Sequence, residues 1–543
     1  MTPRHVNARS SSGGDPAVDS TKNVTRTPTG RAARAQARYR SAMDPEAAPP
    51  DEAALKRHRP LYRAIARRLN PRVRRSDITV TDEPTVRRAT KAAAVGNAME
   101  WFDFGIYSYL AVIIGKVFFP GAGATQLLAS FTAFAASFLV RPLGGLFFGP
   151  LGDRIGRKQV LALTMVLMAA GTFAIGLIPS YATIGVASPV LLLVCRMVQG
   201  FSTGGEYGGA ATFIAEYAPD KRRGFFGSFL ELGTLAGYTG AAALVLLLNT
   251  TLGEQTMLDW GWRIPFLVGG PIGVVGLYLR LKLEETPAFR KQVEELSHSA
   301  NAAAEARSAP KAAENTPKRE FSAIFAGQWQ RLLLCIGLVA AYNITDYMLL
   351  SYMPAYLTSE MGYSGSMELV AAIIAMVAMM TVLQQIGRLS DRVGRKPILL
   401  AGMLGFLVLT VPAFQLFRLG NFLAAVGGLL VLGACLVCLL GTMSATLPAL
   451  FPTKVRYGSL SIGYNVATSI FGGTAPGIMT YLVDSTGNNL APAFYASGAA
   501  LLGIIAVLCM RETAQQPLDG SPPSVSTEEE AKELVRKQSS NQR

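Results

Sequence analysis

The chain carries one charged heptapeptide twice, first as Gly152-Asp153-Arg154-Ile155-Gly156-Arg157-Lys158 and again as Ser390-Asp391-Arg392-Val393-Gly394-Arg395-Lys396. Each copy follows a long apolar run and precedes another. A second echo, Glu285-Thr286-Pro287 and Glu512-Thr513-Ala514, stands further along each half. Parallel repeats of this kind are typical of membrane proteins whose two helical halves enclose a central site. The repeat therefore predicts two similar halves in one chain.

The apolar runs around these repeats are long enough to cross a membrane. Of the 543 residues, 50% are hydrophobic and only 16% are charged, against about 25% charged in soluble domains. Because about 20 apolar residues span a bilayer, hydropathy predicts about twelve spans. They lie near residues 91–119, 127–151, 160–177, 190–217, 225–248, 262–281, 331–357, 369–389, 397–417, 422–450, 458–483 and 492–510. We expect an all-α membrane protein with twelve transmembrane helices in two six-helix halves.

The basic residues between these spans predict the orientation of the chain. Lys and Arg gather after spans two, four, six, eight and ten, whereas the odd-numbered connections hold little beyond Lys116 and Arg418. Cytoplasmic loops carry such an excess, so both termini are expected in the cytoplasm. We divide the chain into a basic, mostly disordered cytoplasmic extension (1–90), an N-terminal six-helix half (91–281), a central cytoplasmic loop (282–330), a C-terminal six-helix half (331–511) and a cytoplasmic tail (512–543).

The first predicted span contains two carboxylates, in Gly96-Asn97-Ala98-Met99-Glu100-Trp101-Phe102-Asp103-Phe104-Gly105-Ile106-Tyr107. A charge at the bilayer centre costs about 2.5–3.5 kcal/mol on insertion scales, and such residues usually serve a proton, an ion or a substrate. All three histidines lie outside the predicted spans, so a proton relay would use carboxylates. The candidates for proton coupling are Glu100, Asp103 and Glu206; the alternative is that they form structural pairs with Arg141 and Arg196.

Several motifs resemble the major facilitator superfamily. Residues 149–158 resemble its signature loop between spans two and three, and Arg196 to Gly204 resembles its R-x-x-x-G-x-x-x-G signature in span four. Further stretches, at 96–105, 141–145, 204–207, 259–266 and 283–289, resemble the metabolite:proton symporter branch. Within that branch the likeness is nearest to the osmosensory proline/glycine-betaine:proton symporters. The resemblance covers about residues 72 to 515 and implies alternating access in a bacterial plasma membrane.

A zwitterionic solute needs one partner for each of its charges. Arginine binds carboxylates bidentately, and aromatic faces attract quaternary ammonium groups. We therefore expect a substrate-binding site, with no catalytic residues, made of Arg141, Arg196, Trp101, Phe104, Tyr107, Tyr347 and Tyr352. Any one of these aromatic residues could instead serve packing alone. Glu231 and Asp346 are weaker candidates, and Asp346 departs from the resemblance because the proline/betaine carriers offer an aromatic residue there.

The repeated heptapeptide predicts a gate at the cytoplasmic face. Its charges are expected to latch the two halves together and to release them when the site opens inward; the alternative is that they only determine topology. The gate residues are Gly152, Asp153, Arg154, Gly156, Arg157, Asp391, Arg392 and Arg395.

The two ends of the chain lie outside the repeat. Residues 1–91 carry 20 Lys and Arg against 9 Asp and Glu, so most of the net charge of +15 sits there and does not call for a nucleic-acid partner. The basic amphipathic piece at 60–69 is expected to lie on anionic lipid; the alternative is a solvated tail. At the other end Thr527 is expected to cap a short helix ending near Lys537. It is too short for a coiled coil, so dimerisation through one is not expected.

Three functions fit these patterns. The first is proton-coupled symport of a zwitterionic compatible solute such as proline or glycine betaine. The second is proton symport of organic acids of the dicarboxylate, citrate or shikimate type, which two arginines within the spans would suit. The third is a membrane osmosensor that does not transport. An ATP-driven pump is disfavoured because the chain contains no G-x-x-x-x-G-K-[ST] motif. No nucleophile–base pair or metal cluster suggests an enzyme, and we expect neither a cofactor nor a metal.

Overall fold

Helices make up almost all of the part of the chain that the structure describes. The computed structural model describes residues 75, 78–81, 83–155, 157–282, 317–363, 366–453 and 455–540. These residues belong to one compact unit that begins at Val73. The predicted extension before residue 73 and most of the predicted central loop lie outside the described residues.

The first six predicted spans correspond to a series of long helices, several of them broken. The elements are β1 (Thr79–Val80), α3 (Glu83–Tyr109), α4 (Ala111–Phe118), α5 (Ala124–Leu139), α6 (Arg141–Ile155), α7 (Arg157–Leu177), α8 (Tyr181–Ile184), α9 (Ala187–Thr203), α10 (Glu206–Tyr217), the 3₁₀ turn η2 (Asp220–Arg222), α11 (Arg223–Thr256), the π turn η3 (Met257–Gly261) and α12 (Arg263–Lys282).

The last six spans follow the same plan. They are built from α14 (Pro317–Tyr347), the π turn η4 (Met348–Tyr352), α15 (Met353–Ser359), α16 (Met367–Val393), α17 (Arg395–Phe417), α18 (Phe422–Ala449), α19 (Arg456–Ala467), the π turn η5 (Thr468–Gly472), α20 (Ala475–Thr486) and α21 (Ala491–Cys509). The strand β2 (Ser524–Val525) and the helix α22 (Glu528–Ser540) complete the described chain.

Broken helices mark the spans that carry the candidate residues. Span one bends by 62° between α3 and α4, after the turn that holds Glu100 and Asp103. Span two breaks at Val140, immediately before Arg141, and span four breaks at Gly204 and Gly205, immediately before Glu206. Breaks of this kind are tolerated in membranes where other protein groups satisfy the freed backbone. The sequence predicted continuous spans, and the structure shows that these three are broken in the vicinity of their polar residues.

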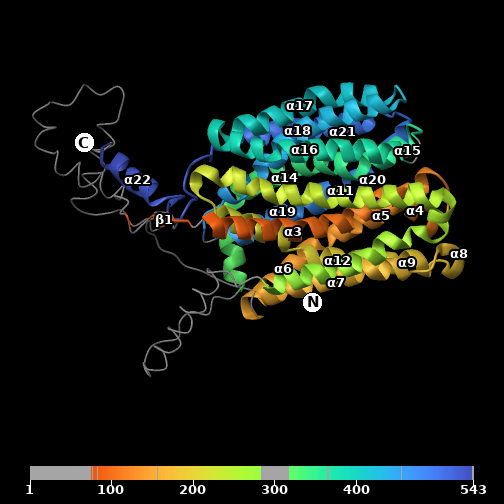
Figure 1. Ribbon diagram of the computed structural model, residues 1–543, viewed down its shortest axis with the longest axis horizontal. Coiled ribbons are helices and arrows are strands. Elements are labelled where there is room, and N and C mark those ends of the chain that lie inside the picture. Colours follow the sequence, from red (N-terminus) through yellow and green to blue (C-terminus); the bar gives the residue numbers. More distant parts are fainter. Residues whose placement is uncertain are drawn as a thin grey trace, which may run out of the picture. The chain divides into compact units, whose positions relative to one another are not determined.

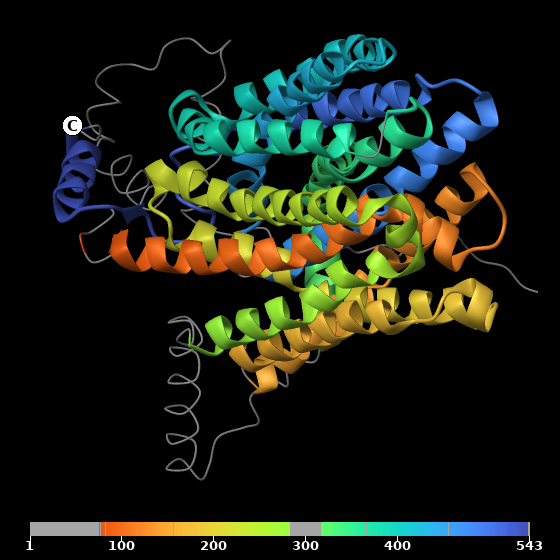
Figure 2. The same cartoon turned by 45° about the vertical axis from the view of Figure 1, so that its right-hand side comes forward.

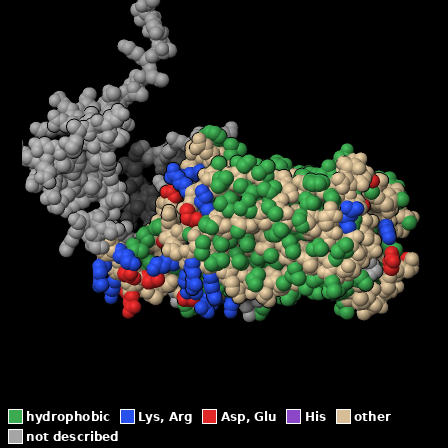
Figure 3. Space-filling view, turned by 90° about the horizontal axis from the view of Figure 1, so that it is seen from above, with side chains coloured by type: hydrophobic (Ala, Val, Ile, Leu, Met, Phe, Trp, Pro, Cys, Tyr) green, Lys and Arg blue, Asp and Glu red, His purple; other side chains and the backbone are tan. Residues whose placement is uncertain are grey.

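Length and composition support the membrane assignment. In the described residues eight helices are long and apolar enough to cross a bilayer, or nine when α3 and α4 count as one bent span. Shorter apolar helices at Ala162–Leu177 and Arg263–Tyr278 correspond to spans three and six. The remaining span, α9 with α10, contains Arg196 and Glu206, and these charges account for its lower hydropathy. In Figure 3 apolar side chains cover most of the visible face, and charged ones gather mainly at the end that carries α22.

The helices of both halves run side by side through the bundle (Figure 1). In two views α7, α9 and α12 lie on the opposite side from α16, α17, α18 and α21 (Figures 1 and 2). Between them α11 packs on α3 of its own half and on α16 and α18 of the other. The two halves also meet where α5 contacts α20 and α10 contacts α19. Residues of both halves therefore face each other in the interior.

The predicted tail helix is confirmed, and it is tied to the start of the chain. Thr527 accepts a hydrogen bond from the backbone N–H of Glu530 (3.2 Å), as a helix cap does. Just before it, β2 pairs in parallel with β1, with Thr79 opposite Ser524. Arg75 also forms an ion pair with Glu528. We call residues 511–540 the tail strap, because they connect the N-terminal end of α3 with both halves.

Candidate functional site

Glu100 and Arg141 form an ion pair inside the bundle. The Glu100 side chain on α3 is 3% exposed and the Arg141 side chain on α6 is 2% exposed, and the distance from Arg141 Nη2 to Glu100 Oε1 is 2.5 Å. Two charges are removed from water here, which is costly unless they neutralise each other. A substrate carboxylate that approaches Arg141 would therefore compete directly with Glu100.

Close helix packing holds Arg141 in this position. Its Nε donates to Thr203 Oγ1 on α9 at 2.9 Å. The two helices approach so closely that a Cβ atom on Gly204 would overlap the carbonyl oxygen of Arg141. Likewise a Cβ on Gly200 would overlap the carbonyl oxygen of Ser137. Small residues at a helix crossing permit this approach, so the glycines of the span-four motif position the arginine.

A chain of hydrogen bonds connects Arg196 with Asp103. Arg196 Nη1 donates to Gln199 Oε1 at 2.9 Å, and Gln199 Nε2 donates to Thr172 Oγ1 at 2.6 Å. Thr172 Oγ1 in turn donates to Asp103 Oδ2 at 2.8 Å. Arg196 is 1% exposed and Asp103 is 5% exposed. The second acid of span one is therefore linked to the second arginine through two neutral side chains rather than by a direct ion pair.

Two further buried carboxylates lie on α10 and α11. Glu206 accepts a hydrogen bond from Thr164 Oγ1 at 2.8 Å. Glu231 is 1% exposed and accepts from four hydroxyls, those of Tyr207 (2.7 Å), Thr234 (3.1 Å), Ser444 (3.1 Å) and Tyr342 (3.2 Å). Ser444 and Tyr342 belong to the C-terminal half. Glu231 thus joins the halves in the interior, a connection that the sequence did not predict.

The predicted aromatic residues separate into three groups. The rings of Phe104 and Tyr107 face guanidinium groups. Arg141 Cζ is 5.0 Å from the centre of the Phe104 ring, and Arg196 Cζ is 4.2 Å from the centre of the Tyr107 ring. Trp101 and Tyr347 instead meet each other across the halves at 5.7 Å between ring centres. Tyr352 lies apart from these contacts and packs on Phe131 (6.1 Å) and Tyr356 (5.6 Å).

Three polar groups near the Trp101–Tyr347 contact are buried without a hydrogen-bond partner among the described residues. They are Trp101 Nε1, Asp346 Oδ1 and the Tyr347 hydroxyl. Their side chains are at most 4% exposed. Because an unpaired polar group in a protein interior costs about 1–3 kcal/mol, such groups call for an explanation.

One charge of the second heptapeptide, Asp391, bridges the halves at the predicted cytoplasmic end. Asp391 accepts from the backbone N–H groups of Gly224 (2.7 Å) and Phe225 (2.9 Å), at the first turn of α11. A carboxylate is favoured there by the helix dipole. Nearby, Arg456 of α19 pairs with Glu216 of α10 at 2.7 Å.

The other predicted gate residues have different surroundings. Arg395 is fully buried and donates to the Ala445 carbonyl and the Thr513 hydroxyl, both at 2.9 Å, so it binds its own half and the tail strap. Arg392 is exposed. The structure does not describe Gly156. For Gly152, Asp153, Arg154 and Arg157 it describes only the helical backbone.

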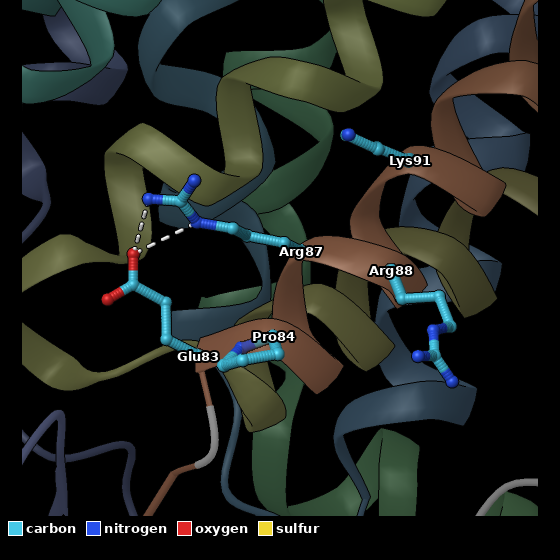
Figure 4. Close-up of a pocket in the computed structure, with 5 residues that line it drawn as sticks. All are labelled: Glu83, Pro84, Arg87, Arg88 and Lys91. Atoms are coloured by element: carbon cyan, nitrogen blue, oxygen red, sulfur yellow. Dashed lines mark hydrogen bonds and ion pairs between the residues drawn. The ribbon is translucent and has the colours of Figure 1, made fainter.

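A pocket of about 520 Å³ lies at the first turns of α3, lined by Glu83, Pro84, Arg87, Arg88 and Lys91 (Figure 4). Arg87 points toward Glu83, with which it forms an ion pair at 2.8 Å, whereas Arg88 points away. The pocket contains none of the predicted substrate or proton residues, and its arginines are exposed. The buried charges rather than this surface pocket therefore define the candidate site.

Sequence reasoning missed several residues that the structure places in the site. Gln199 and Thr172 complete the connection between Arg196 and Asp103, and Phe138 faces Arg141 at 4.7 Å. Gln199 lies three residues after Arg196, so the helical period already places both on neighbouring faces. A polar residue in an apolar span was the available signal for Thr172. Nothing comparable distinguished Phe138 from packing residues.

The chain is similar to known transporters. Residues 89–523 match the family described as sugar (and other) transporter. The chain is 47% identical over 460 residues to the proline/betaine transporter of Escherichia coli K12, covering 84% of this chain and 90% of the relative. It is 46% identical over 466 residues to the glycine betaine/proline/ectoine/pipecolic acid transporter OusA of Dickeya dadantii, covering 86% and 91%. The ectoine/proline transporter ProP of Corynebacterium glutamicum is 43% identical over 474 residues, covering 86% and 92%.

Solved structures share the fold at low sequence identity. The major facilitator superfamily proton:xylose symporter XylE, bound to a bromodeoxyglucose, superposes with a TM-score of 0.62 at 18% identity, covering 83% of this chain and 99% of the other. This likeness shows the fold. The expected all-α architecture of a major facilitator protein is thereby confirmed.

Proposed function

This chain belongs to the sugar (and other) transporter family of the major facilitator superfamily, a family of transporters and not of enzymes, and we propose that it is a proton-coupled symporter of a small zwitterionic solute. Proline and glycine betaine, which its relatives are named for, are the proposed substrates. Transport proceeds by alternating access between the two halves. The single observation that carries the proposal is the buried ion pair between Glu100 and Arg141.

The pair supplies a simple means of coupling. When the carboxylate of a zwitterion binds Arg141, it displaces Glu100 from this ion pair. An isolated carboxylate in an apolar interior is strongly disfavoured, so Glu100 takes up a proton. The loaded site then holds a neutral acid and a neutralised arginine, and the halves can rock. When the substrate leaves on the other side, Arg141 pairs with Glu100 again and the proton is released.

The second arginine and the second acid support this cycle. Arg196 reaches Asp103 through Gln199 and Thr172, so a change at either end alters the hydrogen bonds between them. We propose Asp103 and Glu206 as auxiliary proton sites. The gate of the proposed cycle includes Asp391, which must leave the first turn of α11 before the cytoplasmic side can open.

The protein is a multi-span membrane protein, and we further propose that it lies in the cell membrane with both termini in the cytoplasm. The basic residues of the connections support this orientation. Residues 1–74 lie outside the described chain; from their charge we propose contact with anionic lipid rather than nucleic acid. The tail helix α22 has 13 residues, which is short for a coiled coil, so we propose no dimerisation through it.

Uptake by purified protein in proteoliposomes tests the proposal. Radiolabelled proline and glycine betaine should accumulate when an inward proton gradient is imposed, and a protonophore should abolish the accumulation. Unlabelled 2-oxoglutarate in excess should compete poorly, because the buried acids repel a second carboxylate. Uptake that ignores both the gradient and the protonophore would contradict symport. Stronger competition by 2-oxoglutarate than by betaine would favour an organic-acid carrier, and no uptake at all would favour a sensor.

A further inference from the structure

Asp346 is a buried acid without a described counter-ion. It lies on α14, is 2% exposed, and its Oδ1 atom has no hydrogen-bond partner among the described residues. A second acid, Glu231, acts on it electrostatically. Glu231 is bound by four hydroxyls rather than by Lys or Arg. Two acids together in a low-dielectric interior attract a cation.

The rings beside Asp346 have the composition of a site for a cation. Trp101 lies 5.5 Å from Tyr238 and 5.7 Å from Tyr347 between ring centres. Tyr109 contacts Tyr238 at 6.0 Å between ring centres. Aromatic faces attract an ammonium group that comes within about 6 Å of the ring centre. Two atoms of this cluster, Trp101 Nε1 and the Tyr347 hydroxyl, are also without described partners, so the cluster has polar capacity that a ligand would use.

Charges of opposite sign act on the cluster. Both Arg141 and Asp346 act electrostatically on the hydroxyls of Tyr238 and Tyr347. Arg141 belongs to the N-terminal half and Asp346 to the C-terminal half. A zwitterion placed against these tyrosines would meet both a positive and a negative charge.

We infer that Asp346 binds the cationic group of the substrate and selects ammonium groups that carry N–H donors. This inference rests on the proposed transport of zwitterions and adds a residue that determines specificity. A carboxylate forms short, charge-assisted hydrogen bonds with N–H donors. A quaternary ammonium has no such donor and gains only general attraction and contact with the rings. The site should therefore favour secondary ammonium groups, as in proline, over fully methylated ones.

A substrate series on the wild-type protein tests the inference directly. Proline, N-methylproline and N,N-dimethylproline share one ring and one carboxylate but carry two, one and no N–H donors. We expect KM to rise along this series by about tenfold overall. In Asp346→Asn the difference should shrink to about threefold or less, mainly through a higher KM for proline. Asp484→Asn, an exposed aspartate of α20, is the matched control and should keep the wild-type order.

The outcomes separate the inference from the proposed function. Equal KM values along the series in wild type would overturn the role of Asp346, whether or not its variant folds. The same result follows if Asp346→Asn keeps the wild-type order, or if it loses only accumulation against a gradient, which would make Asp346 a proton site. If wild type accepts none of the three zwitterions and no glycine betaine, the proposed function fails, and this inference fails with it.

Discussion

Replacing Glu100 by Gln should uncouple transport from the proton gradient. Glutamine has the shape of glutamate, and its carbonyl oxygen can still accept from Arg141 Nη2, but it cannot take up or release a proton. A pH difference of one unit corresponds to about 1.4 kcal/mol, enough for one proton per substrate to concentrate the substrate about tenfold. We expect wild type to approach this ratio and Glu100→Gln to remain near one.

The ion pair also sets an expected cost in stability. Removing one partner of a buried pair typically costs about 3–5 kcal/mol, because the other charge is left unpaired. The retained hydrogen bond should reduce that cost for Gln. Thermal unfolding in detergent should therefore show a moderate loss of stability, and the variant protein should be compared with wild type at equal amounts of folded carrier.

Two assays distinguish coupling from simple damage. Accumulation of labelled betaine under an imposed pH gradient measures coupling, whereas counterflow exchange needs only binding and movement of the halves. Glu254→Gln is the matched control, since Glu254 is 82% exposed and 3.8 Å from Lys116, and such surface pairs contribute about 0–1 kcal/mol. Full accumulation by Glu100→Gln would refute the reasoning and direct attention to Glu206. Loss of both activities in a folded variant would mean that the pair with Arg141 is structural.

Two further predictions concern the ends of the chain. Deleting residues 2–70 should leave transport intact but move its osmotic threshold, because each basic residue near an anionic surface contributes about 1 kcal/mol that salt screens; uptake across a range of osmolality checks this, and an unchanged threshold would make the extension passive. Burial opposes ionisation of Glu512, but backbone N–H groups of Arg395, Lys396, Thr513 and Ala514 lower its pKa below the usual glutamate value. Its hold on the tail strap is therefore present at neutral pH and is lost as pH falls through this lowered pKa. Glu512→Gln should therefore speed protease cleavage within residues 511–540 by about threefold or more at pH 7, with Glu529→Gln as an exposed control; equal rates would contradict this.

The repeat and the hydropathy of the spans were sufficient to predict the architecture. The two heptapeptides placed six spans in each half, and the fold agrees. Thr527 was recognised as a helix cap because capping is a local interaction between residues three apart. The pairing of β1 with β2 was not predictable in this way. It joins residues 79–80 with 524–525, and two-residue strands have no periodic pattern to detect.

In the candidate site, too, the sequence revealed local features but not contacts between distant residues. Glu100, Asp103, Arg141 and Arg196 were identified because a charge inside an apolar run is visible in the sequence alone. Their partners were not. Glu100 pairs with a residue 41 positions away, whereas Asp103 reaches an arginine only through two neutral side chains.

Asp346 and Glu231 illustrate why sequence alone does not distinguish a structural buried acid from one that binds substrate. In the sequence both are single acids in apolar spans, and they differ in nothing that periodicity can measure. In the structure Glu231 receives four hydroxyls from both halves, while Asp346 Oδ1 receives no hydrogen bond from the described residues. An acid that is fully satisfied by the protein is suited to holding helices together, and an acid that is left unsatisfied is suited to binding what the protein does not supply. The distinction depends on which hydroxyls the fold brings near each acid. For that reason Asp346 is the residue that we expect to decide which zwitterion is carried.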